Sequence, residues 1–266
     1  MDRGINIAAY LRSNASRTNE RVTHFGTQLG ASLESREHPV ECDLAIQAGF
    51  QISPAMKDAM ERRIPIIILE NPVWHYGDKS STYTWGYNGL NNLGWAPPVP
   101  TGKARPHPPL GAWRDIDSGS KVIFGQVEND KALRGEDIYE WVEEMQGIYP
   151  DAEFREHPVM LDQRVEQESF ESVMERCSLA ITYNSTVGAE AIIRGIITTV
   201  SHEGSWAYPM RGVSSYPRDK WITDLSWRHW STDEDIDVDW ILSGYDEALA
   251  QAQRGEYDNM SNGRDQ

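Results

Sequence analysis

Residues 178–200 read SLAITYNSTVGAEAIIRGIITTV, a pattern that predicts a strand, a turn, a helix and a second strand. Leu179 to Thr182 is a short apolar run that favours a strand. Val187 to Ile193 repeats apolar residues at helical spacing, and Gly195 stands where a helix ends and the strand from Ile196 to Val200 begins. Two strands joined by a helix are typical of a parallel α/β sheet.

The turn in this stretch has the composition of an anion site. Asn184, Ser185, Thr186 and Gly188 are small residues at a helix N-terminus, where hydroxyls, unpaired backbone N–H groups and the helix dipole favour a phosphate. Glu190, one turn into the helix, could accept hydrogen bonds from a ribose. Ser and Thr are also the ordinary helix N-caps, so the same residues fit a plain helix start.

The rest of the chain alternates strands and helices in the same way. Strands are expected at 5–10, 44–46, 65–70, 121–124 and 152–155, and helices at 19–33, 54–63, 137–148, 170–176 and 240–254. Residues 71–114 are rich in Gly, Pro, Asn and aromatic residues, and we expect them to be ordered but irregular. The alternation favours an α/β fold with two lobes, 1–115 and 116–232, followed by a helix and polar tail, 233–266.

The chain is strongly acidic. Its 266 residues carry 41 acidic and 25 basic side chains, a formal net charge of −16. Such a field repels nucleic-acid phosphates, so a nucleic-acid partner would need a local basic patch. Part of the acidic excess lies at 233–239, where it could be only a solvated face.

Cysteine usage and hydropathy predict in which cellular compartment the protein lies. Cys42 and Cys177 are isolated thiols, as expected of a protein kept in a reducing compartment. The longest purely aliphatic run, Ile66 to Leu69, is far too short to span a bilayer, and no signal-peptide pattern opens the chain. We therefore expect a cytoplasmic protein without a membrane span.

Three loops of the second lobe are expected at one edge of its sheet, because ligands of open α/β sheets bind beyond the carboxyl ends of the strands. They hold Gly125-Gln126, His157-Pro158 and Ser185-Thr186. His157 can donate to a phosphate, and Gly125 permits close backbone approach. His157 could equally end a strand, and Gly125 could be only a turn residue. A Walker loop, a Gly-x-Gly-x-x-Gly fingerprint after a strand and zinc-ligand spacing are all missing from the sequence.

Residues 124–130 (FGQVEND), 154–158 (FREHP) and 183–191 (YNSTVGAEA), with Arg194-Gly195, resemble the successive motifs of capsule-polysaccharide Kdo transferases. The His-Pro and Ser-Thr pairs are also similar to those of bacterial sialyltransferase-like enzymes. The resemblance covers roughly residues 121–208. Two departures are Arg155-Glu156 before the histidine and Gly204-Ser205-Trp206-Ala207-Tyr208 in place of a Gly-Pro-Phe-Tyr element.

The resemblance implies a GT-B-like glycosyltransferase with two Rossmann-like lobes and a cleft between them. The C-terminal lobe would hold a CMP- or UDP-linked sugar donor, and the acceptor would approach from the N-terminal lobe. Donor-binding residues would be Gly125, Gln126, His157, Ser185, Thr186, Gly188 and Glu190. GT-B enzymes generally need no metal, because helix dipoles and side-chain donors neutralise the leaving phosphate, so we expect neither a metal nor a cofactor besides the nucleotide-sugar co-substrate.

Transfer to a hydroxyl acceptor also needs a general base. Glu70, at the end of a predicted strand, is the first candidate, followed by His75 and Asp78 in the next loop. Each of them could equally be a surface group or a cap.

The acceptor and the activity itself are left open by the sequence. A saccharide acceptor fits the resemblance and the Trp-rich segment. The rival is a hydroxymethylated base in bacteriophage DNA, which would require clustering of Arg62, Arg63, Lys103, Arg105, His107, Arg114, Arg211, Arg218, Lys220 and Arg228. A further alternative is a module that binds a nucleotide without turning it over.

Overall fold

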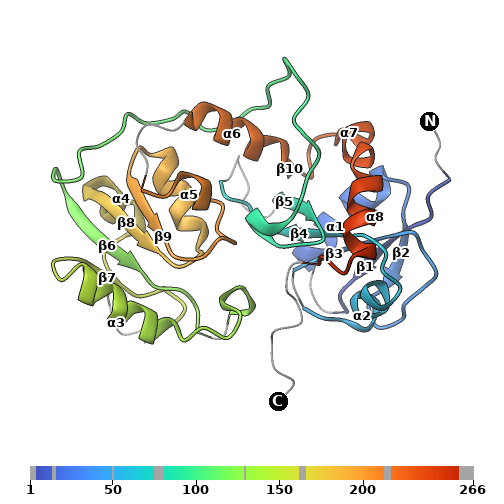
Figure 1. Ribbon diagram of the computed structural model, residues 1–266, viewed down its shortest axis with the longest axis horizontal. Helices are drawn as coiled ribbons and strands as arrows, with labels where there is room; N and C mark the ends of the chain where they lie inside the picture. Colours follow the sequence, from blue (N-terminus) through green and yellow to red (C-terminus); the bar gives the residue numbers. More distant parts are fainter. Residues whose placement is uncertain are drawn as a thin grey trace. The chain divides into compact units, whose positions relative to one another are not determined.

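The computed structural model describes residues 4–13, 16–49, 51–74, 81–128, 130–161, 166–212 and 217–257 (Figure 1). Its contacts divide the chain into two compact units. Unit 1 comprises described residues of 4–106 and 223–257, and unit 2 comprises those of 107–222. We expected boundaries at 115 and 232; the contacts place them at 106 and 222.

Unit 1 contains a six-stranded sheet in the order β10-β5-β4-β3-β1-β2. Its strands are β1 (Ile7–Leu11), β2 (Ser32–Ser35), β3 (Leu44–Ala48), β4 (Ile66–Glu70), β5 (Thr82–Tyr87) and β10 (His229–Ser231). β2, β1, β3 and β4 run parallel, whereas β5 and β10 are antiparallel to their neighbours. The helical elements are α1 (Ser16–Gln28), α2 (Pro54–Glu61), η1 (Asn91–Leu93), α7 (Val238–Ser243) and α8 (Tyr245–Gln253).

Helices cover both faces of this sheet. On one face, Phe25 of α1 and Trp240 of α7 share a core with Ile7, Ile46 and Trp85. The other face packs against α2, whose buried residues cluster with alternate residues of the same parallel strands. This two-sided burial explains why the strands are continuous apolar runs.

Unit 2 contains four parallel strands in the order β7-β6-β8-β9. They are β6 (Ser120–Phe124), β7 (Glu153–Arg155), β8 (Cys177–Thr182) and β9 (Ile197–Val200). The helical elements are η2 (Lys131–Leu133), α3 (Ile138–Ile148), α4 (Phe170–Arg176), α5 (Thr186–Ile193) and η3 (Tyr208–Met210), and α6 (Arg218–Trp227) spans the boundary at 222. Residues of α3 form one core with Ile123 and Ile181, and residues of α4 and α5 form another with Val122 and Ala180.

The predicted mixed α/β class with parallel strands is confirmed, and three local predictions are wrong. Residues 71–114 contain a fully buried strand, β5, that we expected to be irregular. The helix expected at 19–33 ends at Gln28, because β2 begins at Ser32. The helix expected at 240–254 is divided at Gly244 into α7 and α8.

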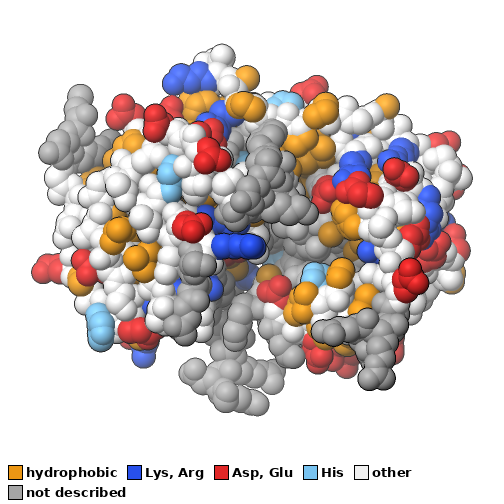
Figure 2. Space-filling model, turned by 180° about the vertical axis from the view of Figure 1, so that it is seen from behind, with side chains coloured by type: hydrophobic (Ala, Val, Ile, Leu, Met, Phe, Trp, Pro, Cys, Tyr) orange, Lys and Arg blue, Asp and Glu red, His pale blue; other side chains and the backbone are white. Residues whose placement is uncertain are grey.

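Figure 2 shows acidic side chains scattered over the drawn face, in keeping with the net charge of −16. Cys42 and Cys177 are both buried free thiols. No helix among the described residues is both long and apolar enough to cross a bilayer.

Candidate functional site

The strand order of unit 2 reverses between β6 and β8. From β6 the chain passes through α3 to β7 on one side, then through α4 to β8 on the other side of β6. Ligands of open α/β sheets bind at the carboxyl ends of strands beside such a reversal. Because the four strands are parallel, the loops that begin at residues 125, 156, 183 and 201 all lie at this edge.

Contacts between these loops show that they meet. The Asn184 side chain, after β8, donates from Nδ2 to the Ala132 carbonyl oxygen of η2 at 2.5 Å. Asp130, which precedes η2, interacts electrostatically with His157, after β7. The Gly125 N–H, directly after β6, donates to the carbonyl oxygen of Arg155, the last residue of β7, so the segments that follow β6, β7 and β8 lie at one edge of the sheet.

The surroundings of His157 fix the roles of its two ring nitrogens. Nδ1 accepts a hydrogen bond from the Val159 N–H at 3.2 Å, so the neutral imidazole carries its proton on Nε2. Burial lowers the pKa of His157, although the Asp130 carboxylate partly offsets this effect. At neutral pH the residue is therefore a neutral imidazole whose Nε2–H group is a hydrogen-bond donor.

The β8–α5 turn has the predicted conformation. Ser185 is the N-cap of α5, and its hydroxyl accepts a hydrogen bond from the Val187 N–H at 3.3 Å. Thr186, the first residue of the helix, is half-buried. Gly188 faces inward: an added Cβ would lie 3.0 Å from both the Ala207 Cβ and the Thr182 Oγ1. Gly188 thus permits close packing of α5 on β8, and its donor-binding role stays a prediction.

Two further predicted donor-binding residues already have protein partners. The Gly125 N–H donates to the Arg155 carbonyl oxygen at 2.8 Å, which extends the pairing of β6 with β7. The Glu190 Oε1 lies 2.7 Å from the Arg194 Nη2, one turn along α5. Arg194 also pairs with Glu171 at 2.6 Å. The ribose-binding role of Glu190 stays a prediction.

Three buried side-chain oxygens stand at the reversal point without a hydrogen-bond partner among the described residues. They are Gln126 Oε1 after β6, Thr182 Oγ1 at the end of β8, and Asn184 Oδ1. An unpaired buried polar atom costs about 1–3 kcal/mol. Such atoms call for an explanation, which a bound polar ligand or water would supply.

Sequence reasoning missed His202, which follows β9 at the same edge. Its ring lies 5.4 Å from that of Tyr183, between ring centres, and its backbone N–H donates to the Tyr183 carbonyl oxygen at 3.0 Å. The rule that selected the other loops would have found it, because it stands two residues beyond a strand of the same sheet.

Of the three candidate bases in unit 1, the structure places Glu70. It is the last residue of β4, half-buried at the carboxyl edge of the parallel strands. Arg12 and Arg21 both interact electrostatically with it. His75 and Asp78 lie outside the described residues.

The arginines among the basic residues named above for a nucleic-acid face make hydrogen bonds within the fold. Every arginine among them donates to backbone carbonyl oxygens. Arg114, for example, bonds the carbonyl oxygens of Met174, Glu175 and Cys177 from one nitrogen. The residues of that list are also divided between the two units.

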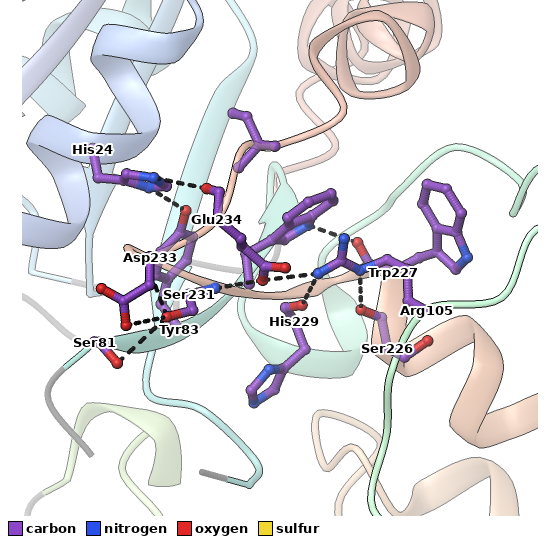
Figure 3. Close-up of polar contacts among 12 residues, drawn as sticks. His24, Ser81, Tyr83, Arg105, Ser226, Trp227, His229, Ser231, Asp233 and Glu234 are labelled. Carbon is purple, nitrogen blue, oxygen red and sulfur yellow. Dashed lines mark hydrogen bonds and ion pairs between the residues drawn. The ribbon is translucent and has the colours of Figure 1, made fainter. Parts of the chain in front are cut away.

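Figure 3 shows the polar contacts of Arg105. Its Cζ lies 3.3 Å from the centre of the Trp230 ring, and its guanidinium donates to the carbonyl oxygens of Ser226 and His229 and to Glu234 Oε1. A hollow of about 520 Å³ lies beside it, lined by Arg105, Trp227, Trp230 and residues 235–239. Because these indoles are at most 3% exposed, the hollow offers little aromatic surface to a ligand.

Solved structures that are similar to this chain include two glycosyltransferases. Both are KpsC proteins of Thermosulfurimonas dismutans. The β-Kdo 2,7-transferase is 11% identical, with a TM-score of 0.46, and the match covers 74% of this chain and 78% of that one. The β-Kdo 2,4-transferase is 16% identical, with a TM-score of 0.45, covering 74% and 79%. No family model and no curated protein matches the sequence.

The family of these two structures is the one that the sequence motifs resemble. Similarity at this level carries no conclusion about activity, which has to come from the residues themselves.

Proposed function

We propose that the chain is a GT-B-type glycosyltransferase that uses a nucleotide-sugar donor. The observation that carries the proposal is the meeting of three loops at the β6/β8 reversal, with His157 and the N-terminus of α5 both at that edge. Unit 2 would bind the donor, and unit 1 would bind the acceptor.

The donors at this edge suit a phosphate leaving group. When the bond from the anomeric carbon to the phosphate oxygen breaks, negative charge grows on that phosphate. The Nε2–H of His157, the Thr186 hydroxyl and the positive end of the α5 dipole would stabilise it without moving, which is the condition for a large electrostatic effect. These donors support a metal-independent reaction with a CMP- or UDP-linked sugar. Gln126 and Asn184 have buried oxygens that a nucleotide could satisfy.

Glu70 is the proposed general base. Its carboxylate at the end of β4 would take the proton of the acceptor hydroxyl, whose oxygen then bonds to the anomeric carbon. Both acceptor classes named from the sequence, a saccharide and a hydroxymethylated base in DNA, supply such a hydroxyl.

Two experiments test the proposal: nucleotide binding is measured first, and turnover of the nucleotide-sugar is measured second. CMP, UDP and their sugar conjugates should each be screened for an increase in the unfolding midpoint, because a ligand of the folded state alone raises it. His157→Ala should weaken binding of the stabilising nucleotide by about 10- to 100-fold, the effect of losing a hydrogen bond to a charged group. The exposed His38→Ala is the matched control.

Glu70→Gln separates an enzyme from a nucleotide-binding module. The variant should bind the nucleotide like the wild type but release it from the sugar donor at least about 100-fold more slowly. Unchanged turnover would remove Glu70 from the reaction. Equal nucleotide affinity of His157→Ala and wild type would contradict the proposed donor site.

A further inference from the structure

Arginine side chains gather at the carboxyl edge of the parallel strands of unit 1. Arg12 directly follows β1, and Arg36 directly follows β2. Arg17 and Arg21 lie in the first turns of α1, which begins at the same edge because it follows β1. Glu70, the proposed base, ends β4 there. We call these four arginines the arginine edge.

Arg12 is built into this edge. Its Nη2 donates to the Ala48 carbonyl oxygen at 2.8 Å. Its backbone N–H and carbonyl oxygen bond to the two ends of the Asn19 amide, at 2.8 and 2.6 Å. Gly49 has a φ of +70°, and a Cβ there would lie 2.5 Å from the Arg12 Nη2. These contacts fix the Arg12 side chain in place. Among the described residues, its buried Nε has no hydrogen-bond partner, so this N–H remains as a donor for a ligand.

The charges of this edge act on one another. Burial lowers the pKa of Arg12, the charge of Arg36 lowers it further, and that of Glu70 raises it. Burial likewise lowers the pKa of Arg21, with Glu70 raising it and Arg17 lowering it. Glu70 therefore interacts with both Arg12 and Arg21, while Arg36 acts on Arg12 and Arg17 acts on Arg21.

Part of this positive charge is already balanced. Arg36 pairs with Glu37 at 3.1 Å and donates to the Gln51 side chain at 3.0 Å. Arg21 donates to the Asn71 side chain at 3.2 Å, and Glu20 lies near it. The guanidiniums still repel one another, and a bound anion would relieve this repulsion. They are a local concentration of positive charge in a chain whose net charge is −16.

We propose that the arginine edge binds the phosphodiester backbone of a nucleic-acid acceptor strand, with the nucleotide that carries the reacting hydroxyl at Glu70. The inference rests on the proposed function and names its acceptor class. A guanidinium fork matches phosphate oxygens, and phosphates on both sides of one nucleotide would meet the arginines on both sides of Glu70. An uncharged saccharide would leave these arginines unexplained, and an oligosaccharide with several carboxylates is the rival ligand in the test below.

In the reaction, Glu70 takes the proton of the acceptor hydroxyl. The hydroxyl oxygen bonds to the anomeric carbon as the carbon–phosphate-oxygen bond breaks, and the nucleotide leaves with that electron pair. An enzyme that acts on a base in a strand needs that base unstacked, so a single strand is the simplest probe.

Binding of a labelled single-stranded oligonucleotide to the full chain, followed by fluorescence anisotropy over a salt series, tests the proposal. Arg17→Gln, at an exposed position, should weaken binding about tenfold. It should also reduce the slope of log affinity against log salt by about 0.7, the value for one lost phosphate contact on a single strand. Arg36→Gln should behave alike, and Arg12→Gln is the stronger test if it folds. Arg254→Gln, an exposed arginine paired with Glu256, is the control and should match the wild type.

Two results would overturn the proposal. One is failure of the wild type to bind the oligonucleotide while a donor nucleotide still raises its unfolding midpoint, which would leave the proposed function standing. The other is binding of a carboxylated oligosaccharide, weakened by Arg17→Gln, without any binding of the oligonucleotide. The expected positive result is completed by a mass increase of one sugar on an oligonucleotide with hydroxymethylated bases, lost in Glu70→Gln.

Discussion

At the scale of single residues, the position of His157 could be predicted from the sequence, whereas its protonated ring nitrogen could be identified only from the structure. The position after a predicted strand was visible in the sequence, and the structure places the residue there. The proton position was not visible, because it depends on the Val159 N–H that faces Nδ1. In the same way, the arginine edge escaped prediction. Arg12 and Arg36 are far apart along the chain, and only the parallel pairing of β1 with β2 brings them to one edge.

Replacing His157 with Gln should flatten the pH dependence of stability. Since burial lowers the pKa of His157, the unfolded chain takes up a proton at higher pH than the folded chain does. The free energy of unfolding therefore falls as the pH drops through the unfolded pKa of about 6.5, and the fall ends below the folded pKa. Glutamine does not titrate.

Urea unfolding on both sides of this window measures the difference. The wild type should lose more stability than His157→Gln between neutral and mildly acidic pH. Burial also lowers the pKa of His24, which contributes with the same sign in both proteins and cancels from the comparison. An equal loss in the two proteins would mean that His157 is not buried as described.

At the scale of elements, long periodic segments were predictable and short paired ones were not. Ser53 caps α2 one residue before its expected start at 54, and Asp137 caps α3 at its expected start. β5 was missed although Tyr83, Trp85 and Tyr87 alternate with Thr82, Thr84 and Gly86, because the surrounding residues 71–114 are rich in Gly, Pro and Asn. β10 has only three residues and owes its strand form to β5.

Gly188→Ala should destabilise unit 2 by about 1–3 kcal/mol, the usual effect of overpacking. The added Cβ would lie 3.0 Å from Ala207 Cβ and Thr182 Oγ1, and α5 would have to move away from β8. Because its N-terminus belongs to the proposed donor site, nucleotide affinity should fall as well. The measurement is the urea midpoint together with nucleotide titration.

A second-site change checks this explanation. Ala207→Gly removes one of the two opposing atoms, so the double variant should be more stable than the sum of the single effects predicts. Gly147→Ala, at an exposed position of α3 with nothing within 4 Å of the new Cβ, should be neutral or stabilise by about 0.5–1 kcal/mol. Simple additivity at 188 and 207 would refute the packing explanation.

At the scale of the whole molecule, the chain leaves unit 1 and returns to it. A linear reading placed residues 116–232 in one lobe, because composition gives no sign of the return. The structure instead pairs β10 with β5 and adds Trp230, Trp240 and Ile241 to the core that holds Phe25 and Trp85. Long-range side-chain pairing of this kind depends on the folded sheet and is invisible to local periodicity.

This connectivity predicts different behaviour of two fragments. Unit 2 is continuous in sequence and has a core on each face of its sheet, so residues 107–222 should fold alone, unfold cooperatively in urea and bind the donor nucleotide within a few-fold of the full chain. Residues 1–106 should not fold alone, because the missing segment supplies β10 and several core tryptophans. Adding a peptide of residues 223–266 should restore the near-ultraviolet signal of buried tryptophan. A cooperative transition of 1–106 by itself would contradict the division, since β5 would then need no partner from the far end of the chain.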